Sequence, residues 1–228
     1  EQEKRMMIAQ LSHDIKTPIT SIQVTVEGIL DGVIKEEERL HYLATIGRQT
    51  ERLNKLVEEL DVLTLNRQPQ DTADEEVEEV FLDQLLIESM SEFQLQIEQE
   101  ERDVYIQVSP ESAKIKSHSD KLSRILVNLL NNAFKYSEPG TRIEVLAQLT
   151  EQELTISVKD EGQGILPEDL GKIFNRLYRV ETSRNMKTGG HGLGLAIAQE
   201  LAHQLGGKIT AESQYALGSK FTFCLNLK

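Results

Sequence analysis

The residue best suited to nucleophilic chemistry is a histidine near the start of the chain. His13 stands in the run Leu11-Ser12-His13-Asp14-Ile15-Lys16-Thr17-Pro18. With about 100° of rotation per helical residue, its side chain points about 150° away from the centre of the apolar stripe, which disfavours a core histidine. Asp14 follows directly, and a carboxylate beside a ring nitrogen can raise its nucleophilicity or accept its proton. An ordinary exposed histidine is the alternative.

A second chemical pattern lies in a predicted helix at residues 119–136. Asn128 and Asn132 are four residues apart and therefore share one face of that helix. Two carboxamide oxygens on one face can bind Mg²⁺, which takes few protein ligands and keeps its waters. Lys135 could then meet phosphate charge. The alternative is that these asparagines are surface polar residues, although asparagine is a mediocre helix former.

Two glycine-containing segments would let the backbone approach a ligand closely. In Val158-Lys159-Asp160-Glu161-Gly162-Gln163-Gly164-Ile165 a predicted strand ends at an acid that can accept a hydrogen bond from the exocyclic amine of a base. In Thr188-Gly189-Gly190-His191-Gly192-Leu193-Gly194-Leu195 glycines precede an apolar helix, whose free amides can bind phosphate oxygens. The second run matches neither a P-loop nor a dinucleotide-binding fingerprint. His191 is interpreted as a solvent-facing residue.

The histidine is positioned by an N-terminal helical region, residues 1–67. Apolar residues recur there at steps of three and four, with a turn near Asp31-Gly32, and Glu36-Glu37-Glu38 favours the start of a second helix. Pro18 predicts a kink beside the histidine. One such hairpin cannot bury the apolar stripes of both arms, whereas two hairpins can pair into a four-helix bundle. The sequence therefore predicts a homodimer.

The other candidates are positioned by a second region that follows an acidic, proline-containing linker at residues 68–76. Over residues 77–228 helical and strand periodicities are mixed, which predicts a two-layer α/β sandwich with a mixed sheet. We expect helices at about 81–100, 119–136 and 192–205, and strands at 104–108, 143–149, 154–158, 208–210 and 220–225, with 143–149 and 154–158 paired as a hairpin.

The composition restricts the possible partners. The formal net charge is −13, with 38 acidic against 25 basic residues, so direct nucleic-acid binding is disfavoured. The chain has no apolar run of about eighteen residues, so we expect no membrane-spanning segment within it. The charged N-terminus lacks a signal-peptide core and indicates a piece of something longer. Cys224, in an alternating run, is expected to be a small buried strand residue rather than a reactive thiol.

Taken in order, these segments resemble the sensor histidine kinases of bacterial two-component systems. The histidine, asparagine, aspartate-glycine and glycine-rich boxes are accompanied by a phenylalanine box, Ile173-Phe174-Asn175-Arg176-Leu177-Tyr178-Arg179, and a weaker last box, Gly218-Ser219-Lys220-Phe221. Asn175 replaces a common acid, and Ala216-Leu217-Gly218 lacks a usual glycine. The resemblance implies a dimerisation and histidine-phosphotransfer hairpin at 1–67, the linker at 68–76 and a Bergerat-type ATP-binding domain at 77–228.

The resemblance also implies roles for particular residues, with ATP and Mg²⁺ as cofactors. His13 is the implied phospho-acceptor, Asp14 assists proton removal, and Thr17, one helical turn on, is implicated in dephosphorylating the partner. Asn132 and Asn128 hold magnesium, and Asp160 recognises the adenine amine. The further residues implied at the nucleotide are Lys135, Tyr136, Gly162, Gly164, Ile165, Phe174, Arg176, Arg179, Gly190, His191, Gly192, Leu193 and Gly194, with about 174–190 forming a lid.

The implied function is an ATP-dependent protein-histidine kinase. It phosphorylates its own histidine, passes the phosphoryl group to an aspartate of a response regulator receiver domain, and can also dephosphorylate that regulator. We expect a cytoplasmic portion of a plasma-membrane sensor, attached only through segments outside this chain. Hsp90-, gyrase- and mismatch-repair-type ATPases share the implied fold, but Asn128 stands where they place a catalytic glutamate, and a carboxamide is no general base. A pseudokinase scaffold is the other alternative, which the intact His13, Asn132 and Asp160 disfavour.

Overall fold

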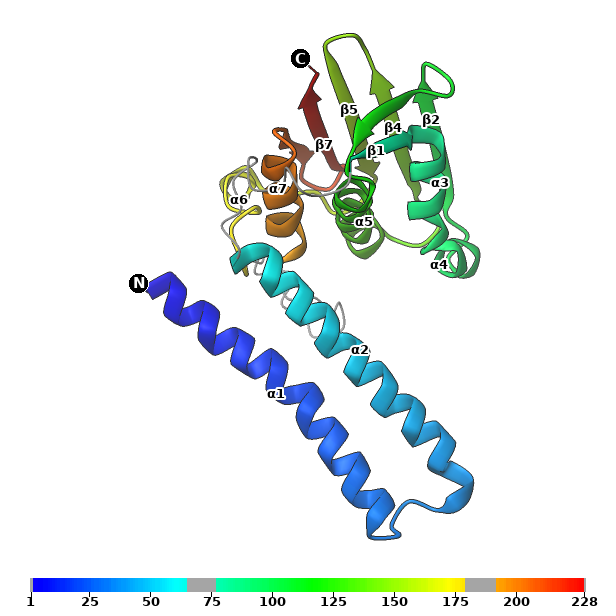
Figure 1. Ribbon diagram of the computed structural model, residues 1–228, viewed down its shortest axis with the longest axis vertical. Helices are drawn as coiled ribbons and strands as arrows, with labels where there is room; N and C mark the ends of the chain where they lie inside the picture. The colour runs from blue at the N-terminus through cyan, green and yellow to red at the C-terminus, as the bar shows by residue number, and fades with distance from the viewer. Residues whose placement is uncertain (1, 65–76, 179–191, 228) are drawn as a thin grey trace. The chain divides into compact units, whose positions relative to one another are not determined.

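The structure, a computed structural model, describes residues 2–64, 77–178 and 192–227 (Figure 1). The chain divides into two compact units, one ending at Thr64 and one containing everything after it. The predicted linker, 68–76, lies outside the described residues. Within the described ranges, no helix is long and apolar enough to cross a lipid bilayer.

The first unit is a helical hairpin. Helix α1 (Gln2–Leu30) runs through Pro18 as one helix, and α2 (Arg39–Thr64) packs beside it (Figure 1). The chain reverses at Gly32, whose φ of +70° is easily reached without a side chain, and the Ile34 N–H closes the turn on Gly28 O at 2.9 Å. The three glutamates do not open α2 as predicted. They form a separate 3₁₀ turn, η1 (Glu36–Glu38), directly before it.

The second unit is built on a five-stranded mixed sheet, which confirms the predicted fold class. The strand order is β2-β4-β5-β7-β6, in which β2 and β4 are parallel and every other neighbouring pair is antiparallel. The predicted hairpin of adjacent strands, β4 with β5, is confirmed. The strands are β2 (Asp103–Ser109), β4 (Arg142–Leu149), β5 (Glu153–Asp160), β6 (Lys208–Gln214) and β7 (Gly218–Asn226).

Helices cover one face of this sheet (Figure 1). The central one, α5 (Ser119–Tyr136), has the predicted bounds, and α7 (Gly194–Gln204) packs beside it. The core lies between α5 and the inward-facing residues of strands β4 and β5. The helix presents apolar side chains at the helical period and each strand presents them at every second residue. The fully buried members of the core include Leu122, Ile125, Leu126, Leu129, Leu130, Ile143, Val145, Leu154, Ile156 and Val158.

The predicted single helix at about 81–100 is wrong. The structure has α3 (Leu82–Ser91) and α4 (Gln94–Gln99), because the chain leaves helical geometry at Phe93 (φ −103°, ψ 2°) and buries that ring. Two short strands were also missed, β1 (Glu78–Phe81) and β3 (Lys114–Ser117), which pair as a separate antiparallel ladder. Strands of four residues are too short for alternation to identify. The helix α6 (Pro167–Leu170) was also missed, because four residues are too few to show a helical period.

Candidate functional site

His13 lies on α1 with its side chain 81% exposed. Its Nδ1 is 3.5 Å from Asp14 Oδ1, the outer limit of a hydrogen bond, and the Asp14 side chain is largely buried. The Thr17 hydroxyl donates to the His13 carbonyl at 3.0 Å, which is the helix-shaping arrangement that competes with a role in chemistry. The His13 ring therefore has one edge exposed to solvent and the other directed toward the Asp14 carboxylate.

The two asparagines of α5 have their amide groups oriented by the helix itself. The Asn128 and Asn132 side-chain nitrogens donate to Arg124 O at 2.8 Å and Asn128 O at 3.1 Å. With the nitrogens engaged in this way, each amide oxygen can still accept a hydrogen bond or bind a cation. A Cβ built on Gly194 would lie 2.9 Å from Asn128 Oδ1, so the asparagine face of α5 meets the start of α7.

On this face the protein itself would offer a divalent ion the uncharged amide oxygens of Asn128 and Asn132. In the ranges that the structure describes, no cluster of three or more His, Cys, Asp or Glu side chains could hold a metal ion. Amide oxygens together with phosphate oxygens are ligands that Mg²⁺ accepts. The arrangement suits an ion that arrives with a phosphate ligand.

Asp160 ends β5 with its side chain buried. Burial raises the pKa of this carboxyl to about 6, against the smaller lowering effect of hydrogen bonds from the backbone N–H groups of Gly162 and Ser219. The Gly162 contact is a 2.8 Å bond to Oδ1. A carboxylate held by backbone donors in a dry setting is a strong acceptor for one further N–H group.

The loop after Asp160 joins three elements. Gln163 N donates to Tyr136 O at 3.1 Å, so the loop is tied to the last turn of α5. A side chain at Gly162 would collide with Tyr136 O, and one at Gly164 (φ +65°) would collide with Gln214 O. Glycine is required at both positions because the backbone segments touch. The asparagine helix, the aspartate strand and the turn between β6 and β7 thus converge.

The structure adds one serine that sequence reasoning missed, Ser213. The Ser213 hydroxyl accepts from Ile165 N at 2.8 Å and donates to Gly218 O at 2.8 Å, and it lies 3.0 Å from the Ser219 hydroxyl. Ser213 thereby fixes the far side of the glycine loop. The weak last box pointed to Gly218 and Ser219, but a serine in strand β6 gives no signal of its own.

The remaining predicted site residues are placed only in part. The Lys135 ammonium lies 5.0 Å from the Tyr136 ring centre. Phe174 is half-buried and Arg176 is exposed. They lie in the stretch whose Leu177 N donates to Gly192 O at 3.0 Å.

The Leu193 side chain is fully buried, so only its backbone could face a ligand. The other three, Arg179, Gly190 and His191, lie outside the described residues, together with most of the expected lid.

Two family models match the chain, one mainly in each unit. Residues 3–68 match the His Kinase A (phospho-acceptor) domain. Residues 117–228 match the histidine kinase-, DNA gyrase B- and HSP90-like ATPase domain. The chain thus joins a phospho-acceptor domain to an ATPase domain of this family. The chain belongs to the sensor histidine kinases of two-component systems.

Individual relatives agree. The chain is 38% identical over 229 residues to histidine protein kinase SaeS of Staphylococcus epidermidis and 39% identical over 230 residues to SaeS of Staphylococcus aureus. Each alignment covers 99% of this chain and 64% of the relative. Acinetobacter baumannii histidine kinase AdeS superposes with a TM-score of 0.72 at 25% identity, over 95% of this chain and 98% of AdeS.

A solved complex shares the fold. Histidine kinase ThkA, crystallised with response regulator protein TrrA, has a TM-score of 0.67 at 22% identity, over 98% of this chain and 61% of ThkA. At that identity the likeness shows the fold alone.

Proposed function

We propose that this chain is an ATP-dependent protein-histidine kinase that phosphorylates His13 and passes the phosphoryl group to an aspartate of a response regulator. The observation that carries the proposal is the exposed His13 ring beside Asp14, inside a segment matching a phospho-acceptor domain. The convergence of α5, Asp160 and the start of α7 supports a nucleotide site in the second unit.

The histidine chemistry follows from the two ring nitrogens. With its proton on Nδ1, the ring faces Asp14 with that N–H and keeps a free lone pair on Nε2. Nε2 attacks the γ-phosphorus of ATP, the bond to the β–γ bridging oxygen breaks, and ADP leaves. Asp14 stabilises the positive ring that forms and accepts its Nδ1 proton. In the second step the same phosphoryl group moves from nitrogen to an aspartate oxygen.

The nucleotide would be held by three kinds of contact. Asp160 accepts a hydrogen bond from the adenine amine, and Gly162 and Gly164 let the base approach the backbone. The free amides at the start of α7, near Gly192 and Gly194, face the phosphates with Lys135. Asn132, with Asn128, would hold Mg²⁺, which neutralises phosphate charge.

Transfer to a side chain is favoured over hydrolysis by Asn128. An amide cannot remove a proton from water at neutral pH, and its nitrogen is already committed to Arg124 O. His13 and Asp160 belong to different compact units, so the proposed reaction brings an acceptor of one unit to a nucleotide held by the other. The proposed division is a phosphotransfer hairpin at 1–67, a linker at 68–76 and a catalytic domain at 77–228.

The test is chemical. Incubation of the chain with γ-labelled Mg-ATP should leave label on the protein that is lost in acid and kept in alkali, as expected for a phosphorus–nitrogen bond. A chain that binds ATP but only releases inorganic phosphate would instead be a hydrolase. A chain that binds ATP and does neither would be a scaffold.

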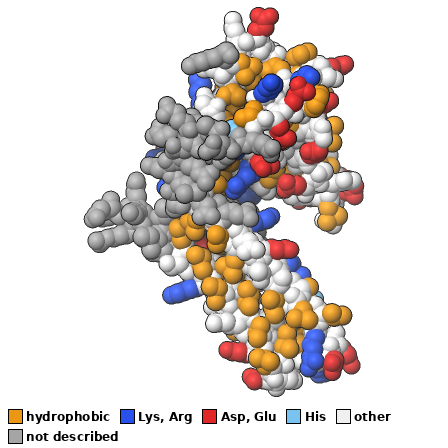
Figure 2. Space-filling view, viewed as in Figure 1, with side chains coloured by type: hydrophobic (Ala, Val, Ile, Leu, Met, Phe, Trp, Pro, Cys, Tyr) orange, Lys and Arg blue, Asp and Glu red, His pale blue; other side chains and the backbone are white. Residues whose placement is uncertain are grey.

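The hairpin would act as a homodimer. It exposes apolar side chains along its length, which Figure 2 shows as a stripe over the helices. Burying such a stripe against a second copy is the bundle solution. The exposed members are Ile19, Val24, Val26, Leu30, Val33, Leu40, Leu43 and Val57.

Leu53→Asp should dissociate or unfold the dimer. Leu53 is half-buried on α2, and an unpaired charge placed in a bundle core costs on the order of 3 kcal/mol or more. Sedimentation at micromolar concentration would measure the change, with Asn54→Asp on the adjacent exposed position as the matched control. A parent chain that already sediments as a monomer would refute the dimer.

The proposal of a response regulator as partner rests on the shared fold with ThkA. ThkA, of the same fold, was crystallised with a response regulator, and this supports a receiver domain as the acceptor for this chain. The net charge of −13 supports a protein partner over nucleic acid. Use of ATP supports a cytoplasmic site of action, and any membrane attachment would come from further segments.

Thr17→Ala should separate two activities. If the Thr17 hydroxyl orients water at a docked phosphoaspartate, dephosphorylation of the regulator should fall roughly tenfold or more while autophosphorylation persists. Thr45 makes the same backbone bond on α2, to His41 O at 3.1 Å, so Thr45→Ala is the matched control. Equal loss of both activities in Thr17→Ala would assign the hydroxyl to shaping the helix.

A further inference from the structure

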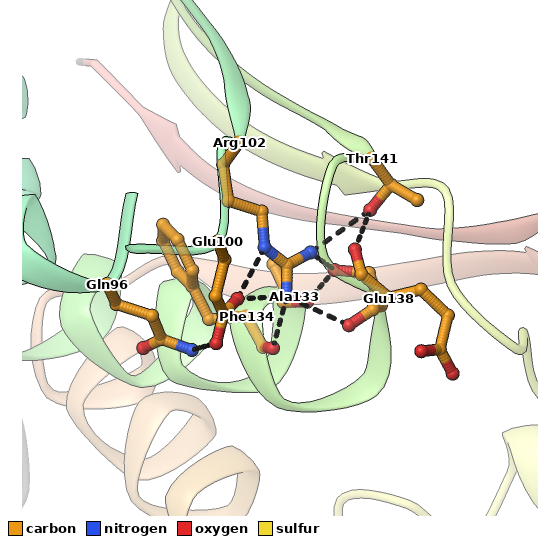
Figure 3. Close-up of polar contacts among 8 residues, drawn as sticks. Gln96, Glu100, Arg102, Ala133, Phe134, Glu138 and Thr141 are labelled. Atoms are coloured by element: carbon orange, nitrogen blue, oxygen red, sulfur yellow. Dashed lines mark hydrogen bonds and ion pairs between the residues drawn. The ribbon is translucent and has the colours of Figure 1, made fainter. Parts of the chain in front are cut away.

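Arg102, just before β2, makes an extensive set of contacts at the carboxyl end of α5 (Figure 3). Its side chain is 1% exposed, and each of its five N–H donors has an acceptor. Nε donates to Glu100 Oε2 at 2.7 Å, Nη1 to the Ser137 and Thr141 hydroxyls at 2.6 and 3.0 Å, and Nη2 to the carbonyls of Phe134 and Ser137 at 3.2 and 2.9 Å.

The buried charge is balanced locally. Glu100 Oε2 lies 2.7 Å from Arg102 Nη2, and Gln96 donates to Glu100 Oε1 at 2.9 Å. Burial opposes ionisation of Glu100, but these hydrogen bonds and the Arg102 charge outweigh it and lower its pKa. The guanidinium also lies 5.6 Å from the Phe134 ring centre, and that ring stacks on Phe93 with centroids 4.6 Å apart.

These contacts supply hydrogen-bond donors to carbonyl groups at the end of α5. The last carbonyls of any α-helix have no partner within the helix. Here Arg102 takes the carbonyl of Phe134 and that of Ser137 just past the helix end, whereas the glycine loop takes the carbonyl of Tyr136 through Gln163 N. Arg102 and the glycine loop therefore bind neighbouring carbonyl groups at the end of α5, in the turn that begins one residue after Asn132.

We propose that Arg102 is a positioning residue for nucleotide binding, which holds the last turn of α5 so that Asn132 faces the phosphates and Tyr136 O receives the glycine loop. This rests on the proposed function. Arginine is required because its planar fork reaches two carbonyls and two hydroxyls at once. A lysine keeps the charge and the stem, but its three donors radiate from one nitrogen.

Arg102→Lys in the full chain tests the proposal. The affinity for Mg-AMPPNP should fall about tenfold, the size expected for one lost charge-assisted hydrogen bond, whereas affinity in EDTA should fall less than about threefold. A loss of folded protein alone would lower both equally, so the ratio of the two dissociation constants separates positioning from general destabilisation. Calorimetry measures both.

Arg142→Lys is the matched control, because Arg142 lies on β4, is partly exposed, and contacts the Tyr105 ring, Asp103 and Glu144, all of them on strands β2 and β4. It should leave the ratio unchanged. Equal affinities for Arg102→Lys and the parent, or equal losses in both lysine variants, would overturn the positioning role while leaving the kinase proposal standing. A parent that binds no nucleotide would overturn both.

Thr141→Val supplies a second test if Arg102→Lys does not fold. It removes one acceptor of the fork and leaves the two helix-end carbonyls engaged. The Mg-AMPPNP affinity should fall about twofold to threefold, again with the smaller change in EDTA. An unchanged ratio in a folded Thr141→Val would count against the proposal.

Discussion

His13→Gln should abolish autophosphorylation and leave ATP binding intact. Glutamine resembles histidine in size and polarity but offers no nucleophilic nitrogen, because its amide lone pair is delocalised. The side chain is 81% exposed, so the change in folding free energy should stay within about 0.5 kcal/mol. The nucleotide site belongs to the other compact unit and should not sense the substitution.

The measurement is acid-labile label on the protein, paired with calorimetry for Mg-ATP. His41→Gln is the matched control, since His41 is an exposed histidine on the other helix of the same hairpin. It should label like the parent. Label that survives in His13→Gln, or disappears in His41→Gln as well, would show that the acceptor is assigned wrongly.

Several elements could be predicted from the sequence because their signal is local and repeated. Helix α5 has the expected bounds since eighteen residues give five turns of an unbroken amphipathic pattern. The β4–β5 hairpin follows from two apolar-rich runs separated by a short polar turn. The helical hairpin follows from apolar steps of three and four along α1 and α2. In each case neighbours in sequence decide the structure.

Other features depend on contacts that no local pattern encodes. The chain leaves the helix at Phe93 because that ring stacks on Phe134, far along the chain. Arg102 reaches Ser137 and Thr141 across 35 and 39 residues, so an arginine between acids gave no reason to expect it at a helix end. The sequence boxes predicted which residue types would lie near one another. The contacts that Ser213 and Arg102 make with the glycine loop and with the end of α5 could be seen only in three dimensions.

Asp160→Asn should weaken ATP binding and reduce the preference for ATP over GTP. The carboxylate offers two acceptors, whereas the amide offers one acceptor and one donor. If the amide oxygen keeps the Gly162 N–H, its nitrogen faces the adenine amine, donor against donor. A buried mismatch of this kind costs about 1–3 kcal/mol, or roughly tenfold to a hundredfold in Kd. Calorimetry with both nucleotides measures it, and Asp103→Asn, an exposed carboxylate, is the control.

The same substitution should change how stability depends on pH. The pKa of Asp160 is about 6 in the folded protein against 3.8 for a free carboxyl, so between these values the folded state keeps a proton that the unfolded state has released. Asp160 should therefore contribute a fall in the free energy of unfolding as pH rises from about 4 to about 6, by a total of about 3 kcal/mol at 1.4 kcal/mol per pKa unit, and this contribution should then level off. Asp160→Asn should lack this fall, and Asp103→Asn should keep it. Urea unfolding of the ligand-free chain from pH 4 to pH 7 measures the slope, and parallel curves for the parent and Asp160→Asn would mean that this carboxyl titrates normally.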